Sequence, residues 1–183
     1  MPQQRISAER VRLRGETDGR WRLGPLLAAT LGVTALEDKL VQRATAAVLN
    51  AIYETDFLPF SYGFRPGRSQ HLCSDALCLG VFKRQVNWVL DADIRSFFDT
   101  IEHEWMQKFL EHKIGDRRLV RLLMKWMKAG VMKDGKLYEV TEGTPQGGII
   151  SPLLANIYLH YVLDLWVQAW REKHAQGDMY VVR

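Results

Sequence analysis

Trp88-Val-Leu-Asp-Ala-Asp-Ile-Arg-Ser-Phe-Phe-Asp99 is the stretch of sequence around which the rest of the chain is organised. Its first three residues are apolar and include aromatic and β-branched side chains, so they predict a short buried β-strand. Carboxylates follow at Asp91 and Asp93, which lie two residues apart and therefore share one face of an extended chain. Oxygen ligands of this kind suit a hard divalent cation such as Mg²⁺. An ordinary solvated strand end is the alternative, and this stretch taken alone favours it.

A second stretch, Glu142-Gly-Thr-Pro-Gln-Gly-Gly-Ile-Ile-Ser-Pro-Leu-Leu-Ala-Asn-Ile-Tyr158, changes that balance. It begins with a loop of Pro145 and two glycines, whose backbone can approach a ligand closely. Ser151 is a predicted N-cap with Pro152 at the first helical position, and apolar residues then recur at the helical period. A glycine-rich loop that leads into a helix N-terminus is suited to hold phosphate, although many such turns bind nothing.

Together the two stretches resemble motif A and motif B of the group II intron-encoded reverse transcriptase and maturase family. Asp93-Ile-Arg-Ser-Phe-Phe98 resembles the catalytic-aspartate motif, and Thr144 to Tyr158 resembles the loop and helix that position template and nucleotide. Ser61-Tyr-Gly-Phe-Arg-Pro-Gly-Arg-Ser69 and Leu36-Glu-Asp-Lys-Leu-Val-Gln42 resemble two blocks of the fingers of the same enzymes. The resemblance runs from about Thr30 to the last residue, with the four blocks in the family's order.

The resemblance implies a set of site residues. It makes Asp93 the catalytic aspartate and a metal ligand, together with the backbone carbonyl of Ile94. Phe98 is placed under the sugar of the incoming nucleotide, where a bulky ring rejects a 2′-hydroxyl. Gln146 and Gly147 are the expected contacts to the nucleotide.

The turn that carries Arg65 and Arg68 is a predicted nucleic-acid contact. The two arginines flank Pro66-Gly67, so a constrained turn holds them beside Phe64. Guanidinium groups next to an aromatic ring suit a single strand, because phosphate contact and base stacking are available together. A structural clamp, with the arginines paired to acids elsewhere, is the alternative. The resemblance favours the first interpretation and adds Pro145, in the template-positioning loop, to the nucleic-acid contacts.

Composition sets wider bounds. The chain has 183 residues, a hydrophobic fraction of 47%, a net charge of +4 and a pI near 9.1, which mildly favours a polyanionic partner. Two cysteines are too few for a disulfide framework. No apolar run approaches membrane-spanning length, and the N-terminus has no apolar core segment. We therefore expect no membrane partner and a cytoplasmic location. The resemblance implies that this location is of bacterial type, associated with the nucleoid or a ribonucleoprotein.

Three regions are expected along the chain: a basic N-terminal arm at 1–24, a fingers-like region at 25–85 and a partial palm at 86–183. The arm carries six arginines and no lysine, which fits either contact with an RNA backbone or a frayed terminus. Residues 24–36 depart from the family, which reads Arg-Pro-Leu-Gly-Ile-Pro where this chain has Ala29-Thr-Leu-Gly-Val-Thr34. In this alignment an arginine expected to touch the incoming nucleotide is missing. A second alignment uses Arg22-Leu-Gly24 and leaves Pro25 to Thr30 as an insertion.

The predicted fold class is α+β: right-hand polymerase fingers and an incomplete palm, rich in helices, with a small antiparallel sheet. Helices are expected at 36–53, 69–84, 102–112, 116–129 and from 151 to about 174. Strands are expected at 88–90, 131–132, 137–140 and 179–182. A basic run that begins just before the fourth of these helices and continues along it is a candidate template-binding surface or a solvated face, with Lys113, Arg117, Arg118, Arg121, Lys125 and Lys128 as its members.

The resemblance implies an RNA-directed DNA polymerase, a nucleotidyltransferase of a group II intron-type retroelement. Its partners would be intron or template RNA, a DNA primer and deoxynucleoside triphosphates, with Mg²⁺ as cofactor and Mn²⁺ as a substitute. The family's second metal-binding pair, in Tyr-Ala-Asp-Asp, is not among the 183 residues, so we expect them to be inactive in polymerisation by themselves. A non-catalytic RNA-binding module and a decayed remnant of such an enzyme are the alternatives. The sequence does not indicate an oligomeric state.

Overall fold

A computed structural model of the chain describes residues 35–83, 86, 88–129, 131–133, 136–138, 142–144 and 148–183. The predicted arm at 1–24, the divergent segment up to residue 34, and Pro145, Gln146 and Gly147 lie outside the described residues. No helix in the part of the chain that is described is both long and apolar enough to cross a membrane.

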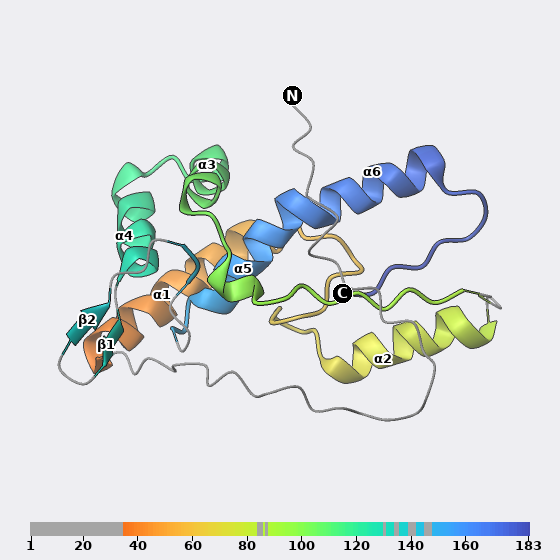
Figure 1. Cartoon of the computed structure of the whole chain (residues 1–183), viewed down its shortest axis with the longest axis horizontal. Helices are drawn as coiled ribbons and strands as arrows, with labels where there is room; N and C mark the ends of the chain where they lie inside the picture. The colour runs from red at the N-terminus through yellow and green to blue at the C-terminus, as the bar shows by residue number, and fades with distance from the viewer. Residues whose placement is uncertain are drawn as a thin grey trace.

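Helices make up most of the described structure (Figure 1). They are α1 (Leu36–Tyr53), α2 (Gln70–Cys78), α3 (His103–Lys113), α4 (Arg117–Lys128), α5 (Ser151–Leu159) and α6 (Leu165–His174). Two π-helical turns, η2 (Leu79–Lys83) and η4 (His160–Asp164), extend α2 and join α5 to α6. A short 3₁₀ turn, η3 (Phe97–Asp99), precedes α3.

Local sequence signals account for the helix starts. The Ser69 hydroxyl accepts a hydrogen bond from the Leu72 amide at 3.3 Å, and the Asp116 carboxylate accepts one from the Arg118 amide at 2.8 Å. Helix α5 begins at Ser151, the predicted N-cap, and so starts one residue earlier than predicted, with proline in its first turn. The predicted helices are therefore present, with small differences at their ends.

The core lies between α1, α3, α4 and α5. Its fully buried side chains include Leu49, Ile101, Leu110, Leu123 and Ile157. Helix α4 is strongly two-sided, since apolar residues at the helical period face this core and arginine and lysine occupy the other side. The α4 basic run is thus held on a rigid, well-anchored helix.

The buried face of α1 differs from the predicted one. Apolar residues recur at the helical period in this segment and predict a buried stripe that includes Leu40, Val48 and Leu49. In the structure Leu40 and Val48 are 64% and 56% exposed, whereas Gln42, Leu49 and Tyr53 are buried. The face that α5 covers, rather than the apolar periodicity of α1 alone, decides which residues are buried.

The small antiparallel sheet of the predicted palm is not found among the described residues, so the predicted fold class is wrong in its sheet. Trp88, Val89 and Leu90, the expected buried strand, have no regular secondary structure and are 90%, 71% and 75% exposed. Residues 179–182 are not in a strand either. A strand needs hydrogen-bonded neighbours to be stable, and the end of the chain instead bonds to the loop around Phe60, with the Arg183 amide 2.9 Å from the Phe60 carbonyl oxygen.

The strand pairing that is described is confined to a hairpin at the edge of the molecule (Figure 1). Its arms, β1 (Val131–Lys133) and β2 (Lys136–Tyr138), are three residues each and pair antiparallel. A hairpin of this size is marginal by itself and does not form a palm sheet.

Candidate functional site

The N-terminal end of α5 is where the recognised sequence blocks meet. The buried Gln42 of α1 accepts a hydrogen bond at its Oε1 from the Ile149 amide, at 2.9 Å, and so holds the turn before α5. The Asn156 side-chain amide donates to the Gly63 carbonyl oxygen at 2.6 Å and ties the fingers-like loop to the same helix. Both contacts join segments more than ninety residues apart.

The motif A and motif B stretches are joined directly. The Thr144 amide donates to the Phe98 carbonyl oxygen at 2.8 Å, and the Gly143 amide donates to the Ile101 carbonyl oxygen at 2.8 Å. His103, at the start of α3, adds a side-chain hydrogen bond of 2.7 Å between its Nε2 and the Gly143 carbonyl oxygen. The beginning of the motif B loop is therefore bound to the segment that follows Asp93.

Gly143 lies in a position that excludes any other residue. Its φ is +87°, and a Cβ placed there would lie 2.6 Å from the Phe98 carbonyl oxygen and 2.8 Å from Asp99 Cα. Both neighbours are backbone atoms, which cannot rotate away. Glycine lets the two motifs approach this closely.

The predicted motif A residues are only partly brought together. Asp91, Asp93 and Ile94 are exposed and lie in an irregular segment, while Phe98 is half-buried beside Phe97, with ring centroids 5.7 Å apart. The described residues thus place Phe98 against the start of the motif B loop. The predicted partners in that loop, Pro145, Gln146 and Gly147, lie outside them.

The donor set does not make a complete metal centre. Within the described residues, no group of three histidine, cysteine, aspartate or glutamate side chains is placed to hold a cation. Asp93 offers one carboxylate, and a two-metal site needs oxygen ligands for both ions. The chain's described residues therefore fit one part of a divalent-metal site and not the whole.

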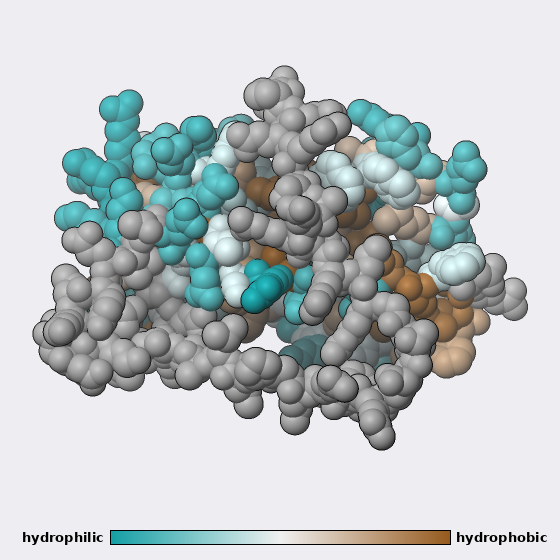
Figure 2. All heavy atoms as spheres, in the orientation of Figure 1, coloured by the Kyte–Doolittle hydropathy of each residue, from teal (hydrophilic) through white to brown (hydrophobic). Residues whose placement is uncertain are grey.

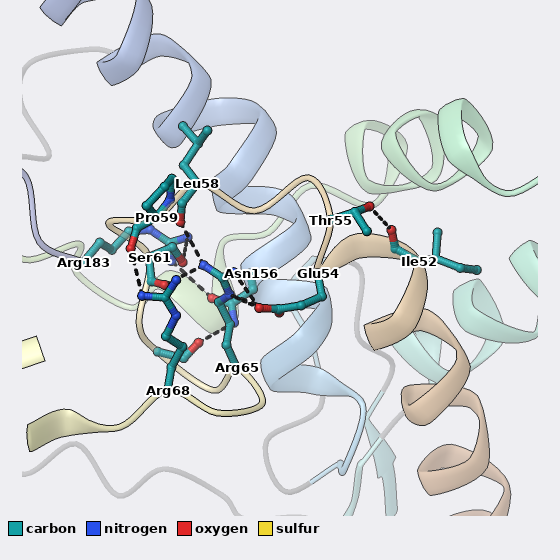
Figure 3. A network of polar contacts seen from close by, with 11 residues as sticks. Ile52, Glu54, Thr55, Leu58, Pro59, Ser61, Arg65, Arg68, Asn156 and Arg183 are labelled. Atoms are coloured by element: carbon teal, nitrogen blue, oxygen red, sulfur yellow. Dashed lines mark hydrogen bonds and ion pairs between the residues drawn. The ribbon is translucent and has the colours of Figure 1, made fainter. Parts of the chain in front are cut away.

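Arg65 has the surroundings of a structural clamp (Figure 3). It is 6% exposed, and its guanidinium binds the Glu54 carboxylate, with Nη2 to Oε1 at 2.6 Å, while Nη1 donates to the carbonyl oxygens of Leu58 and Ser61 at 2.8 and 2.7 Å. Most of its five donors are thereby occupied within the protein. This geometry is that of a structural clamp, in which the arginine is paired with an acid within the protein.

Arg68 and Phe64 present the open side of the same turn. The Arg68 guanidinium stacks over Tyr62 at 5.0 Å and donates one bond, from Nη1 to the Pro59 carbonyl oxygen at 3.2 Å. Phe64 is 73% exposed and has a φ of +53°, which is strained for a residue with a bulky side chain. The contact of this turn with a nucleic-acid strand stays a prediction, and the exposed Phe64 ring and the remaining Arg68 donors are the groups that it would use.

The sequence reasoning missed a buried ion pair between Asp164 and Arg183, beside this turn. Asp164 is fully buried and receives two hydrogen bonds from Arg183, from Nε at 2.7 Å and from Nη2 at 2.6 Å. The same guanidinium reaches Asn156 Oδ1 at 3.2 Å and Ser61 Oγ at 2.8 Å. An acidic residue inside the apolar run around Asp164 was the available signal.

His160, one turn before Asp164, is a second buried titratable group. Burial lowers the pKa of His160 below the ordinary value of 6.5, against the opposing effect of the nearby Asp164 carboxylate. Its Nδ1 has no hydrogen-bond partner among the residues described. The His160 ring forms T-shaped pairs with the rings of Phe57 and Tyr161, at centroid distances of 5.7 and 5.1 Å.

Comparison with known proteins assigns the chain to a protein family. A family model described as "Reverse transcriptase (RNA-dependent DNA polymerase)" matches residues 29–182. Protein YkfC of Escherichia coli (strain K12) is 42% identical over 133 residues, covering 71% of this chain and 35% of that protein. Group II intron-encoded protein LtrA of Lactococcus lactis subsp. cremoris is 40% identical over 149 residues, covering 78% of this chain and 24% of that protein.

A eukaryotic relative shows the same pattern: the Putative COX1/OXI3 intron 2 protein of Saccharomyces cerevisiae is 36% identical over 132 residues, covering 70% of this chain and 15% of that protein. The chain belongs to the reverse transcriptase family. The resemblance to group II intron-encoded proteins is confirmed by these relatives. The chain spans only part of the length of these three relatives: 35%, 24% and 15%.

Proposed function

We propose that this chain forms the fingers and the first part of the palm of an RNA-directed DNA polymerase of a group II intron-type retroelement. The observation that carries the proposal is the hydrogen-bonded join of the two motifs, with the Thr144 amide on the Phe98 carbonyl oxygen. In this assignment the partners are template or intron RNA, a DNA primer and deoxynucleoside triphosphates. A cytoplasmic location near nucleic acid stays a prediction.

Each predicted residue has a role in the proposal. Asp93 and the Ile94 carbonyl would hold a divalent ion, Mg²⁺ or Mn²⁺ in its place, which neutralises charge on the triphosphate when bound. Phe98, supported from behind by Phe97, would exclude a 2′-hydroxyl from the sugar position. Gln146, Gly147 and Pro145 would contact nucleotide and template from the loop that follows Thr144.

The contact of the fingers with the template is best supported at Arg68 and Phe64. Arg68 keeps donors for a phosphate, and the exposed Phe64 ring offers a face on which a base can stack. Arg65, which we also predicted to bind nucleic acid, would act through the protein, because its guanidinium is engaged by Glu54. Its part would be to shape the turn that presents the other two side chains.

Metal binding by the chain in the presence of its substrates tests the proposal. Free Mn²⁺ is titrated by electron paramagnetic resonance with the 183-residue chain, an RNA–DNA template–primer and a deoxynucleoside triphosphate. Retention of Mn²⁺ that depends on the triphosphate and is lost in Asp93→Asn is expected. Asp75→Asn, an exposed acid on α2, is the matched control and should bind as the parent does. Equal retention by Asp93→Asn would refute the assignment of Asp93.

Primer extension separates the enzyme from its alternatives. With Mg²⁺ and all four deoxynucleotides we expect no elongation by these 183 residues, because a single carboxylate does not hold two ions. Elongation would contradict that expectation. A non-catalytic RNA-binding module would bind RNA without any retention of Mn²⁺ that depends on the triphosphate. A decayed remnant would lack a cooperative unfolding transition.

A further inference from the structure

Helices α3 and α4 border a groove of about 620 Å³ that the site above does not use. One rim is basic and belongs to α4, with Arg117, Arg121, Lys125 and Lys128 as its members. Figure 2 shows hydrophilic side chains gathered over this end of the molecule. In Figure 1 the two helices lie at the opposite end from α2, which follows the turn of Arg68.

The cations of the rim are arranged along one line. Residues 117, 121 and 125 are spaced four apart, so they follow each other along the helix at about 6 Å. This step is comparable to that between consecutive phosphates of an RNA strand. All four side chains are exposed, and none makes an ion pair with a carboxylate among the residues described. Their charge is therefore available to a ligand.

The neighbouring Arg118 shows the contrast on the same helix. It does not line the groove, and its guanidinium is paired with Asp116 at 3.1 Å. That carboxylate raises the pKa of Arg118 further. The cations that face the groove are unpaired within the described residues, whereas the one beside them is paired.

The other surfaces of the groove favour a sugar next to the phosphates. Its floor is Val120 and Met124, which are 3% and 7% exposed and so provide a firm apolar base. The wall on α3 carries Gln107 and Glu111, joined by a hydrogen bond of 2.8 Å from Nε2 to Oε1. A carboxylate there repels phosphate and accepts a hydrogen bond from a ribose 2′-hydroxyl. The asymmetry orients a strand with its phosphates toward α4.

We propose that the groove between α3 and α4 binds the sugar–phosphate backbone of a single RNA strand, at a site separate from the motif A and motif B contact. Four cations against one carboxylate leave a charge of +3 around the groove. Recognition would be independent of sequence, because the groups on the rim and the wall face the backbone. The inference rests on the proposed function in taking RNA as the partner.

Fluorescence anisotropy with the full 183-residue chain tests the groove. The probe is an unstructured RNA of about a dozen nucleotides, with no primer, triphosphate or divalent metal present. The double variant Arg121→Gln/Lys125→Gln should bind about tenfold more weakly or worse, and its plot of log affinity against log salt should be shallower by about 1.4. Arg118→Gln, which removes the same charge from the same helix, should bind like the parent.

The other possible results of the anisotropy assay either overturn the proposal or call for a second variant. Unchanged binding by the double variant, or an equal loss in Arg118→Gln, would overturn the proposal. A DNA strand of the same sequence should bind more weakly than the RNA, and equal binding would overturn the assignment to RNA. If the double variant fails to fold, Lys128→Gln with the same probe decides. The assay contains no metal, so it can fail while the Mn²⁺ titration succeeds, and the reverse.

Discussion

The Nε2 atom of His103 lies 2.7 Å from the carbonyl oxygen of Gly143, across forty residues of sequence. A carbonyl oxygen only accepts, so Nε2 must carry the proton and donate it. The bond links the first turn of α3 to the beginning of the motif B loop, next to the backbone bonds that join Thr144 to Phe98. His103 is therefore a positioning residue for the loop.

Replacing His103 with alanine should leave the buried Gly143 carbonyl without this donor. We expect the free energy of unfolding to fall by about 1–3 kcal/mol, measured by urea denaturation. Amide exchange at Thr144 should rise more than exchange within α4. His103→Gln, which retains a side-chain donor, should recover part of the loss. Uniform changes in exchange over the whole chain would contradict a local role.

Gly143→Ala should be among the most damaging small substitutions. It combines a positive φ with a Cβ only 2.6 Å from a backbone oxygen. Strain from the dihedral angle alone costs about 1–3 kcal/mol, and the clash adds to it. Gly177→Ala, at φ +98° with nothing within 4 Å, isolates the strain, and Gly115→Ala has neither problem. Thermal unfolding should rank Gly143→Ala as the least stable and Gly115→Ala as the most stable.

Removing Arg183 should destabilise the chain more than removing both members of its ion pair. Arg183→Met leaves the fully buried Asp164 carboxylate without its main partner, a loss of about 3–5 kcal/mol. In Asp164→Leu/Arg183→Met no buried charge remains, so part of the stability should return. Urea denaturation of the parent and both variants measures the difference. A double variant no more stable than Arg183→Met would contradict this account.

Substitution of Arg65 should affect the stability of the fold, and substitution of Arg68 should affect RNA binding. Arg65→Gln breaks the pair with Glu54 and the bonds to the loop carbonyls, so it should lower the unfolding temperature. Arg68→Gln should leave that temperature nearly unchanged and weaken RNA binding, since Arg68 keeps free donors. Differential scanning fluorimetry and RNA titration are compared for both variants. The reverse pattern would restore Arg65 as a direct contact.

Stability should decrease as pH falls below about 6.5, partly because of His160. Its pKa is lowered in the folded state by burial, so the unfolded chain binds the proton first as pH falls. The loss begins near the unfolded pKa and is complete below the folded one. Asp164, Asp56, Arg183 and Lys113 are the charged groups that act on the ring. His160→Asn should flatten the pH dependence of unfolding in this window, and an unchanged slope would count against it.

Several features of this chain are predictable from sequence because they are local. The bounds of α1, α3 and α4 follow from periodicity and from caps such as Asp116, whose bonds reach only a few residues along the chain. The family is also readable directly from the sequence, as the match to residues 29–182 confirms. The candidate residues Asp93 and Phe98 were found in this way.

The tertiary structure decided the contacts between segments that are separated along the sequence. Sequence does not reveal that Glu54 engages Arg65, that Asp164 binds Arg183, or that the expected strand from Trp88 is exposed. The physical reason is that a strand or a buried charge is stabilised by whichever partner packs against it, and that partner is not a neighbour along the chain: it is 11 residues away for Glu54 and Arg65 and 19 for Asp164 and Arg183. Helix starts depend on neighbours along the chain, and these pairings depend on neighbours in space.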